Sequence, residues 1–597
     1  MSMLRGLICL LLLASAHSAC VLQARPREEP VSVVLTVQNG LQVMLGPSVE
    51  LAQGQLVGSA QAVDGQALDA FLGVRYAQPP VGPLRFAKPQ PVAASNEMIN
   101  ATQFGPACFQ NIPNGNFSED CLFLNLYRPS DPADREKLPV MLFVHGGSFQ
   151  FGTGNQANGS RIVAESVRAG APVIWISINY RLGLFGFLGG SSVLAAAQSG
   201  SAALNPGMYD VRLALEWVKA NIEAFGGDPY RVTLMGQSAG AFITGNQLLA
   251  NGGDTKGLFQ SAIMQSGSPG SASTLPPNHP QLDQTFANIS ALVNCPVAPI
   301  DLSCLKAVDA TTLSAAANNI TSSFYSSWHT GLLPYMPVQD TLVDGFFFSA
   351  PAHELVAQGR FSTVPIISGC NHDEGTGGAP HDLANATVFE KWLQAVAIAD
   401  TSDQARTSRV VNSIFTLYPD NVTLGAPYPS QANPVSAGLS NISDPFYPPS
   451  TNNFKRAAAF YGDWRYVAPH RQFLIKRSNK AQNGVWSYLF AQHDLNVAAS
   501  RGVSHAAEMP YVFGNTSDSS SPGLYLPLSK QMQRAFISFA NFHDPSKLDS
   551  LVWPQFDSEQ RTTMQFKGMD TRAISRYFNE DRLSYLKSDE AAAVLSS

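Results

Sequence analysis

A buried-strand pattern that ends in Gly-Gln-Ser-Ala-Gly at residues 236–240 constrains this chain more than any other feature. Residues 231–235 are mostly β-branched or apolar, and residues 241–250 are compatible with a helix. Strand, turn and helix are the context in which a G-x-S-x-G motif forms a nucleophile elbow, a tight turn that exposes the serine oxygen. The glycines on either side leave room for such a turn, because they carry no side chain. The pattern therefore predicts Ser238 as a nucleophile.

Further apolar runs alternate with helical patterns and predict an α/β fold. The strands are expected at residues 71–76, 139–144, 172–178, 232–235, 261–264, 364–368 and 485–490. Continuous apolar strands separated by helices are typical of a mostly parallel sheet covered on both faces. The clearest helix spans residues 209–224, where apolar residues recur at helical spacing, and Gly-Gly-Asp-Pro at 226–229 ends it. Residues 31–60 indicate a small peripheral sheet.

Two long insertions, at about residues 270–360 and 380–480, are rich in Pro, Ser and Asn. We expect helical caps and loops over the C-terminal edge of the sheet, where open α/β sheets bind their ligands. No internal repeat interrupts the pattern. The sequence therefore predicts a single domain over residues 20–597.

The first 19 residues are typical of a secretory signal peptide. One positive charge is followed by a short apolar run at residues 7–13 and by small residues suited to cleavage after Ala16, Ser18 or Ala19. The apolar run is too short to cross a bilayer. No later segment predicts a membrane span, a lipid anchor or an ER-retention signal. We therefore expect a secreted protein without a transmembrane anchor.

Sequons and cysteines are consistent with secretion. Nine Asn-x-Ser/Thr sequons predict surface glycosylation sites: Asn100, Asn116, Asn158, Asn288, Asn319, Asn385, Asn421, Asn441 and Asn515. Seven cysteines fit an oxidising compartment. The pairs Cys108/Cys121 and Cys295/Cys304 are close in sequence and are expected to form two small-loop disulfides. Cys370 is expected to be a buried free thiol, because no histidine or basic residue stands at a spacing that suggests thiolate activation.

The net charge of −6 argues against one class of partner. It is small for 597 residues, and no run rich in Lys or Arg is present. A nucleic-acid-binding protein would carry a basic patch or stripe. We therefore expect no nucleic-acid partner.

A serine nucleophile needs a base, and the base needs an acid to orient it. In this fold the chain order is serine, acid, histidine. Asp373 and Glu374 follow the expected strand at 364–368, and the residues alone do not choose between them. Five histidines come later in the chain: His381, His470, His493, His505 and His543. His505 is the best candidate, because it lies on a loop of small residues at 502–507.

The oxyanion hole is expected on the loop at residues 145–149, His-Gly-Gly-Ser-Phe, which follows a buried strand. Consecutive glycines allow backbone N–H groups to face a substrate oxygen. The N–H group of Ala239, directly after the nucleophile, is a further donor. His145 is interpreted as a side chain that supports this loop rather than as a base.

The ordered motifs resemble the type-B carboxylesterase/lipase family, which includes fungal lipases and cholinesterases, over nearly the whole mature chain. The matching segments are residues 78–86 (Gln-Pro-Pro-Val-Gly-Pro-Leu-Arg-Phe), 119–127 (Glu-Asp-Cys-Leu-Phe-Leu-Asn-Leu-Tyr), 145–149, 179–181 (Asn-Tyr-Arg), 225–229 (Phe-Gly-Gly-Asp-Pro), 236–240 and the stretch around His505. The resemblance implies the α/β-hydrolase fold, with Ser238 as nucleophile, His505 as base and Glu374 rather than Asp373 as acid.

The same resemblance assigns further residues. It implies Gly147, Ser148 and Ala239 as oxyanion donors, disulfides Cys108–Cys121 and Cys295–Cys304, and a structural ion pair between Arg85 and Glu119. It implies no metal and no organic cofactor.

Three positions depart from the pattern of the family. Gln237 stands before the nucleophile where the family often has Glu, and Ser148 stands where it often has a third glycine. The loop between Cys108 and Cys121 has only twelve residues and no tryptophan. Without that tryptophan and with Gln237 neutral, cation–π binding of a quaternary ammonium group lacks a basis, so a cholinesterase is not expected. The short loop also predicts little lid-controlled interfacial activation.

The sequence therefore predicts a secreted carboxylic-ester hydrolase that acts on small-molecule or lipid-like, hydrophobic esters. Lipase, sterol-esterase and feruloyl-esterase specificities remain alternatives within the same mechanism. The alternative from another class is a catalytically inactive adhesion or binding protein of the same fold. We expect activity to rise with pH as His505 loses its proton, near its ordinary pKa of ~6.5.

Overall fold

The computed structural model describes residues 33–595 except 38–40, 111, 113–114, 131–135, 272–273, 298–301, 327–332, 344–346, 422, 429–451, 482–483, 495–496, 499, 515–524 and 576–578. The predicted signal peptide and the sequons at Asn441 and Asn515 lie outside the described residues. The seven other sequon asparagines are all exposed.

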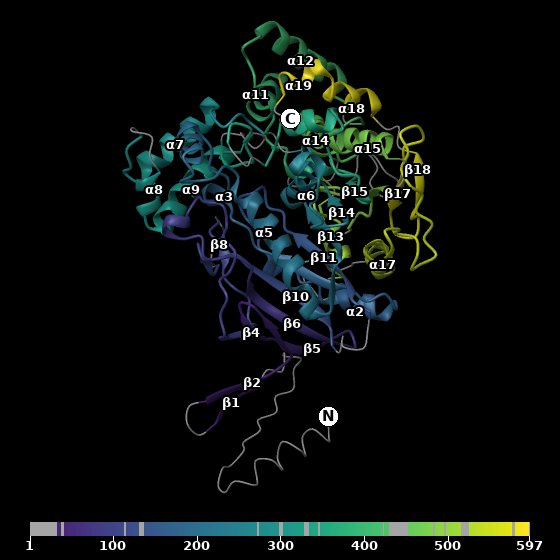
Figure 1. The fold of residues 1–597 in the computed structure, drawn as a ribbon. Helices are drawn as coiled ribbons and strands as arrows, with labels where there is room; N and C mark the ends of the chain where they lie inside the picture. The colour runs from purple at the N-terminus through teal and green to yellow at the C-terminus, as the bar shows by residue number, and fades with distance from the viewer. Residues whose placement is uncertain are drawn as a thin grey trace.

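An eleven-stranded sheet forms the centre of the molecule, in the order β18-β17-β16-β15-β14-β13-β11-β12-β10-β6-β5 (Figure 1). Its strands are β5 (Ser59–Val63), β6 (Gln66–Arg75), β10 (Phe123–Pro129), β11 (Leu138–Val144), β12 (Ile174–Ile178), β13 (Gly227–Gln237), β14 (Ser261–Gln265), β15 (Ile366–Asn371), β16 (Val485–Phe490), β17 (Thr562–Phe566) and β18 (Arg572–Ser575). Every neighbouring pair from β12 to β17 is parallel, and the pairs outside this range are antiparallel. The predicted α/β fold with a mostly parallel core is therefore confirmed.

Smaller strands lie outside the main sheet, two of them in or next to the loop between Cys108 and Cys121, called the flap below. They are β1 (Val33–Val37), β2 (Leu41–Leu45), β3 (Ser48–Leu51), β4 (Gly54–Val57), β7 (Met98–Asn100), β8 (Ala107–Cys108) and β9 (Phe117–Ser118). β1 pairs with β2, and β3, β4 and β7 form a three-stranded sheet. The expected small peripheral sheet is thus present.

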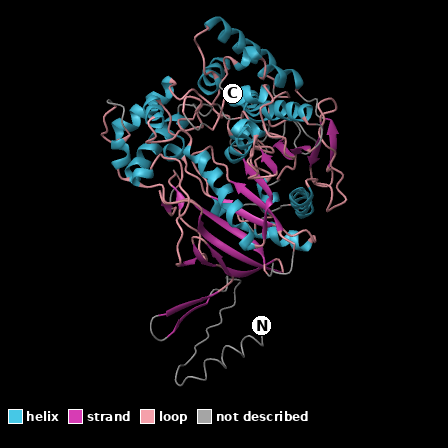
Figure 2. Cartoon of the chain, in the orientation of Figure 1, coloured by secondary structure: helices cyan, strands magenta, loops and turns pink. Residues whose placement is uncertain are grey.

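The central sheet is covered on both faces because its inner strands are apolar throughout. All seven residues of β11 are buried. Successive side chains of a strand point to opposite faces, and the two hydrophobic clusters follow this rule. Leu142 belongs to the cluster that includes helices α5 (Pro206–Asn221) and α6 (Ala239–Leu249), whereas Phe143 belongs to the cluster with α2 (Ser160–Arg168) and α17 (Leu526–Phe542) (Figure 2).

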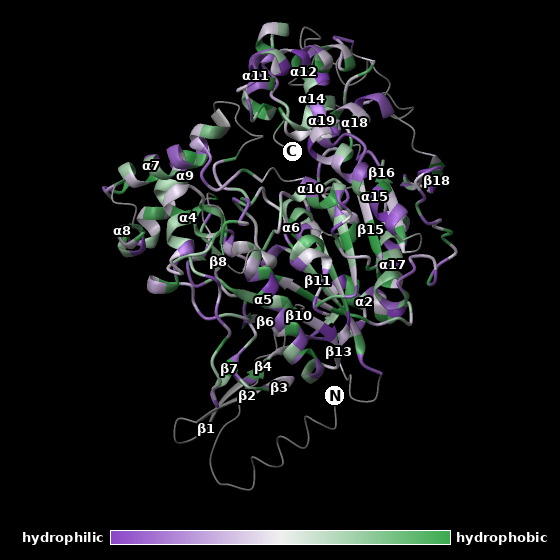
Figure 3. Ribbon diagram, turned by 45° about the horizontal axis from the view of Figure 1, so that its top comes forward, coloured by the Kyte–Doolittle hydropathy of each residue, from purple (hydrophilic) through white to green (hydrophobic). Residues whose placement is uncertain are grey.

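The two insertions are largely helical; in Figure 1 the helices of the first lie mostly at the left and those of the second at the top. Their helices are α7 (Pro280–Leu292), α8 (Ser303–Ala307), α9 (Ala310–Ser326), α10 (Ala352–Ala357), α11 (Ala386–Ala397), α12 (Gln404–Leu417), α14 (Asn452–Gly462), the π-helix η7 (Asp463–Val467) and α15 (Ala468–Lys480). The remaining helices are α3 (Gly183–Phe187), α4 (Ser191–Gln198), α16 (Met509–Phe513), α18 (Glu580–Leu586) and α19 (Asp589–Ala592). The covering helices contain both hydrophobic and hydrophilic residues (Figure 3), as expected for helices with one buried face.

Both expected disulfides, Cys108–Cys121 and Cys295–Cys304, are formed in the structure. The guanidinium group of Arg85 pairs with both carboxylate oxygens of Glu119, at 2.5 and 2.7 Å, and both side chains are buried. No helix among the described residues is both long and apolar enough to cross a membrane.

Candidate active site

Ser238 occupies a strained turn between β13 and α6. Its backbone has φ +55° and ψ −126°, a conformation that non-glycine residues rarely adopt. Close backbone contacts enforce the turn: a Cβ atom on Gly236 would lie 2.3 Å from the carbonyl oxygen of Gly240, and one on Gly240 would lie 2.0 Å from that of Val144. The N–H group of Ser238 donates to the carbonyl oxygen of Gln265 at 2.9 Å. This is the geometry that the elbow motif predicts.

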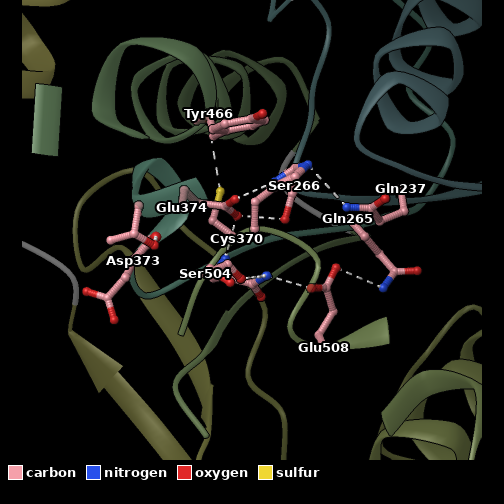
Figure 4. Close-up of polar contacts among 12 residues, drawn as sticks. Gln237, Gln265, Ser266, Cys370, Asp373, Glu374, Tyr466, Ser504 and Glu508 are labelled. Atoms are coloured by element: carbon pink, nitrogen blue, oxygen red, sulfur yellow. Dashed lines mark hydrogen bonds and ion pairs between the residues drawn. The ribbon is translucent and has the colours of Figure 1, made fainter. Parts of the chain in front are cut away.

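His505 is paired with Glu374 across the C-terminal edge of the sheet. Its Nδ1 lies 2.7 Å from Oε2 of Glu374. The other carboxylate oxygen accepts hydrogen bonds from the hydroxyl of Ser266 and the N–H group of Asn371, both at 2.6 Å (Figure 4). The imidazole stacks on Tyr466, with ring centroids 4.5 Å apart. These contacts fix the carboxylate, and the carboxylate orients the ring.

Asp373, the other candidate acid, has a different environment. One carboxylate oxygen accepts a hydrogen bond from the N–H group of Tyr428 and the other from that of Val503, both at 2.8 Å. Nδ1 of His372 lies 3.1 Å from the first of these oxygens. Asp373 thus anchors the loop that carries His505, while Glu374 contacts the imidazole itself.

The loop after β11 presents the expected oxyanion donors. Gly147 and Ser148 have positive φ angles of +108° and +54°, which explains why glycine suits position 148. Among the described residues, neither N–H group donates a hydrogen bond. Ala239 is the first residue of α6, so its N–H group has no partner within the helix. Ser148 lines the same cavity as Ser238, and the assignment of the three N–H groups as oxyanion donors stays a prediction.

The side chain of His145 contacts this loop. Its ring is buried, stacks on Tyr180 with centroids 4.5 Å apart, and has Nδ1 2.7 Å from the carbonyl oxygen of Gly146. Burial lowers the pKa of His145 to about 4, so the ring is neutral near pH 7. These contacts agree with a supporting side chain rather than a base.

The catalytic candidates meet in one cavity of about 430 Å³. Ser148, Ser238, Glu374 and His505 line it, together with Phe149, Phe151, Phe242, Leu333, Gly377, Gly378, Tyr461, Arg465, Tyr466 and Arg501. Five phenylalanine and tyrosine side chains line it, beside two guanidinium groups. The aromatic side chains offer a surface for the apolar part of a substrate.

No hydrogen bond joins Ser238 and His505, both of which are described. Instead, Nε2 of His505 lies 3.4 Å from the side-chain nitrogen of Gln237. Catalytic hydrogen bonds are often long before substrate binds and tighten in the complex. Gln237 therefore contacts the imidazole nitrogen that would accept the serine proton.

Opposing effects act on the pKa of His505. Burial lowers this pKa, but the charge and hydrogen bond of Glu374, with a smaller contribution from Glu508, raise it more. The net pKa lies above its ordinary value of 6.5. The expectation of a midpoint near ~6.5 is therefore revised upward.

Among the histidines that the structure describes, only His505 lines this cavity. His470 corrects one expectation: its Nδ1 lies 3.3 Å from the sulfur of Cys370, which is buried and free. The expected buried free thiol at Cys370 is confirmed, whereas the absence of a histidine partner, which was argued from sequence spacing, was wrong. Helix α15 brings residue 470 beside β15, a contact across 100 residues that sequence spacing does not show.

The comparisons with known proteins agree with this geometry. Residues 46–585 match the model of the carboxylesterase family. The chain belongs to this family. It is 33% identical to "Lipase 2" of Geotrichum candidum, covering 87% of this chain and 92% of that one. It is 32% identical to "Secreted lipase 1" of Botryotinia fuckeliana, covering 86% and 88%.

Solved structures of esterases resemble this carboxylesterase. Aspergillus niger EstA has a TM-score of 0.74 and 26% identity, covering 91% of this chain and 98% of that one. A thermophilic PNB esterase has a TM-score of 0.69 and 25% identity, covering 91% and 100%. The chain is accordingly a carboxylic-ester hydrolase with the α/β-hydrolase fold.

Sequence reasoning missed several residues that surround the base. Tyr466, Ser266, Asn371 and Glu508 were not singled out. Asn371 stands three residues before Glu374 and Glu508 three residues after His505, and this proximity was the available signal for the two.

Proposed function

We propose that this carboxylesterase is a secreted serine hydrolase that cleaves hydrophobic esters through an acyl-enzyme. Ser238 is the nucleophile, His505 the base and Glu374 the acid. The observation that carries the proposal is the Glu374–His505 pair, whose members are 131 residues apart in sequence and line the same cavity as Ser238. A nucleophile, a base and an orienting acid at one site form the arrangement that acyl transfer requires.

In the first step, Nε2 of His505 takes the proton of Ser238 as Oγ attacks the ester carbonyl. The resulting oxyanion receives hydrogen bonds from the N–H groups of Gly147, Ser148 and Ala239. His505 then gives the proton to the departing alcohol, which leaves the acyl group on Ser238. In the second step, His505 takes a proton from water, the hydroxide attacks the acyl carbon, and Ser238 recovers its proton as the acid leaves.

The proposed substrate is an ester with an apolar acyl group. The aromatic wall of the cavity supports this proposal, and so does a second cavity of about 240 Å³ that shares Phe151 with the first. Phe109, Leu182, Leu184 and Phe185 line the second cavity. Because Phe151 lines both cavities, the two spaces are neighbours, and this favours a longer acyl chain and hence a lipase-like specificity.

The test is the rate of hydrolysis of p-nitrophenyl esters of increasing acyl length, with methyl ferulate and a sterol ester for comparison. The proposal expects hydrolysis, with kcat/KM highest for medium or long acyl chains. A preference for acetate would indicate a short-chain esterase. Absence of hydrolysis in folded protein would favour an inactive binding protein.

Secretion is part of the proposal. Relatives are named as secreted lipases, two disulfides are formed, and the seven described sequon asparagines are exposed. Residues 1–19 would be the signal peptide and residues 20–597 a single hydrolase domain.

The pH dependence of kcat/KM is expected to follow the ionisation of His505. Only the neutral imidazole accepts the serine proton, so activity should rise with pH through the pKa of this ring. Since that pKa is raised, the midpoint should lie above 6.5. The measurement is kcat/KM for a p-nitrophenyl ester between pH 5 and 9, and a midpoint below 6.5 would contradict the expectation.

Interfacial activation is expected to be weak, because the flap between Cys108 and Cys121 is short and tied to the oxyanion loop. The side-chain nitrogen of Gln110 donates to the carbonyl oxygen of Gly152 at 2.9 Å, and the N–H group of Gly152 donates to the side-chain oxygen of Gln110 at 2.8 Å. The hydrolysis rate of tributyrin should therefore saturate smoothly as its concentration passes the solubility limit. An abrupt rise at that limit would show that a lid opens at the interface.

A further inference from the structure

A second carboxyl group lies behind the proposed triad and has no part in the mechanism above. Glu508 stands three residues after His505 and is 0% exposed. Its Oε2 accepts a hydrogen bond from the side-chain amide of Asn371 at 2.6 Å, and its Oε1 accepts one from that of Gln265 at 3.4 Å. No ion pair among the described residues includes Glu508. Two side-chain amide groups therefore contact this carboxyl group, and none of the ion pairs in the described part of the chain neutralises it.

Asn371 connects Glu508 with the acid of the triad. Its backbone N–H group donates to Oε1 of Glu374, while its side-chain amide donates to Oε2 of Glu508 and, at 2.9 Å, to the carbonyl oxygen of Ser504 (Figure 4). One residue thus holds both carboxyl groups and the backbone next to His505. A change at Glu508 therefore reaches Glu374 and the imidazole through one residue, whose side chain contacts Glu508 and whose backbone contacts Glu374.

The surroundings of Glu508 favour its neutral form. Burial, followed by the charge of Glu374, raises the pKa of Glu508 to about 7, against an opposing effect of the hydrogen bond from Asn371. The titratable groups nearby are Glu374 and Cys370 from β15 and the turn after it, Tyr488 from β16 and His505 from its own loop. The positive charge of Arg465, on η7, lowers the pKa of His505.

The structure also offers an acceptor for a proton on Glu508. The side-chain oxygens of Gln265 and Asn371 are buried and have no hydrogen-bond partner. The oxygen and nitrogen ends of an amide are assigned from its contacts rather than observed. With the amide of Gln265 turned over, its oxygen would accept the O–H group of a protonated Glu508.

We propose that Glu508 is a positioning residue of the catalytic centre: as a neutral acid it anchors Asn371 behind the Glu374–His505 pair, and as a carboxylate it places a second negative charge there. The inference rests on the proposed triad. A negative charge at Glu508 stabilises the protonated imidazole, so the two groups titrate as a coupled pair. Glu508 thereby sets how far toward acidic pH the enzyme remains active.

The test is the variant Glu508→Gln, which keeps the shape of the neutral acid and cannot ionise. In this variant the pH profile of kcat/KM should follow the ionisation of His505 alone. The pH midpoint of its acid limb should fall by about 0.5–1 unit, because the negative charge that stabilises the imidazolium is gone. Superimposable pH profiles of the two proteins would overturn the proposal.

Thermal stability gives a second readout with a definite sign. Since the folded-state pKa of Glu508 is raised above its ordinary value of 4.5 to about 7, ionisation of this group destabilises the folded wild type as pH rises between these values. The Tm of Glu508→Gln relative to the wild type should therefore be higher at pH 9 than at pH 5. A difference in Tm that does not change with pH would overturn the proposal.

Asp340→Asn is the matched control. Burial also raises the pKa of Asp340 to about 6, but this residue does not line the cavity of Ser238. Its removal should leave the acid limb of kcat/KM at the wild-type pH. A shift equal to that of Glu508→Gln would overturn the proposal, because the effect would then not be specific to the catalytic centre.

Two outcomes separate this inference from the triad assignment. If Ser238→Ala keeps its activity, the triad assignment fails and this inference fails with it. If Ser238→Ala is inactive and the profile of Glu508→Gln is unchanged, only this inference fails.

If Glu508→Gln does not fold, the pH profile of the wild type decides. Coupled titration spreads the acid limb of kcat/KM over a wider pH range than a single ionisation does. An acid limb that fits one ionisation overturns the proposal.

Discussion

Replacing Ser238 with alanine is expected to lower kcat for a p-nitrophenyl ester by about 10⁶-fold, as in other serine hydrolases that lose the nucleophile. Without Oγ no acyl-enzyme forms, and only binding and the oxyanion hole remain to assist water. The fold should tolerate the change, because the strained backbone at Ser238 is held by its neighbours and by its N–H bond to Gln265. The measurement is kcat by stopped assay, with circular dichroism to verify folding.

Ser59→Ala serves as the control for removal of a buried hydroxyl group. Ser59 is the first residue of β5, is 1% exposed, and its hydroxyl has no hydrogen-bond partner among the described residues. It should keep wild-type kcat. Residual activity of Ser238→Ala within tenfold of the wild type would show that another group is the nucleophile.

Glu374→Gln is expected to lower kcat by about 10⁴-fold, the loss seen when a triad acid becomes an amide. The hydroxyl of Ser266 and the N–H group of Asn371 both donate to Oε1, so the amide oxygen of the variant must occupy that position. The amide nitrogen then faces Nδ1 of His505 and donates to it. The imidazole proton moves to Nε2, where it prevents acceptance of the serine proton.

Asp373→Asn is the matched comparison, since it makes the same chemical change one residue earlier. The carboxylate oxygens of Asp373 each accept a backbone N–H group, and the variant leaves one of these donors facing an amide nitrogen. The free energy of unfolding should therefore fall by about 1–3 kcal/mol. The loss of kcat should be far smaller than for Glu374→Gln, and equal losses in the two variants would contradict the choice of acid.

The sequence predicted the elements whose signal is local. The inner strands are continuous apolar runs, and the elbow carries its own glycines, so β13, Ser238 and α6 were found together. Strands β17 and β18 were missed because Thr562–Phe566 and Arg572–Ser575 are short and partly polar. At the edge of a sheet, pairing with a neighbouring strand compensates for weak local propensity.

The sequence could not resolve contacts made by packing between distant elements. Asp373 and Glu374 are adjacent and chemically similar, and only the direction of each side chain separates their roles. The contacts of Cys370 with His470 and of Gln237 with His505 join residues 100 and 268 positions apart. Such pairs form when distant helices, strands and loops pack together, and no local sequence pattern encodes this packing.

The most direct test of the central claim is the reaction of the folded protein with a p-nitrophenyl phosphonate, followed by mass spectrometry of its peptides. The account predicts one phosphonyl group per active chain, attached to Ser238, with loss of esterase activity in parallel. Labelling should be much slower in Glu374→Gln, because the base is held in the wrong tautomer. Complete inactivation with the label on another residue, or activity that survives full labelling of Ser238, would contradict the account.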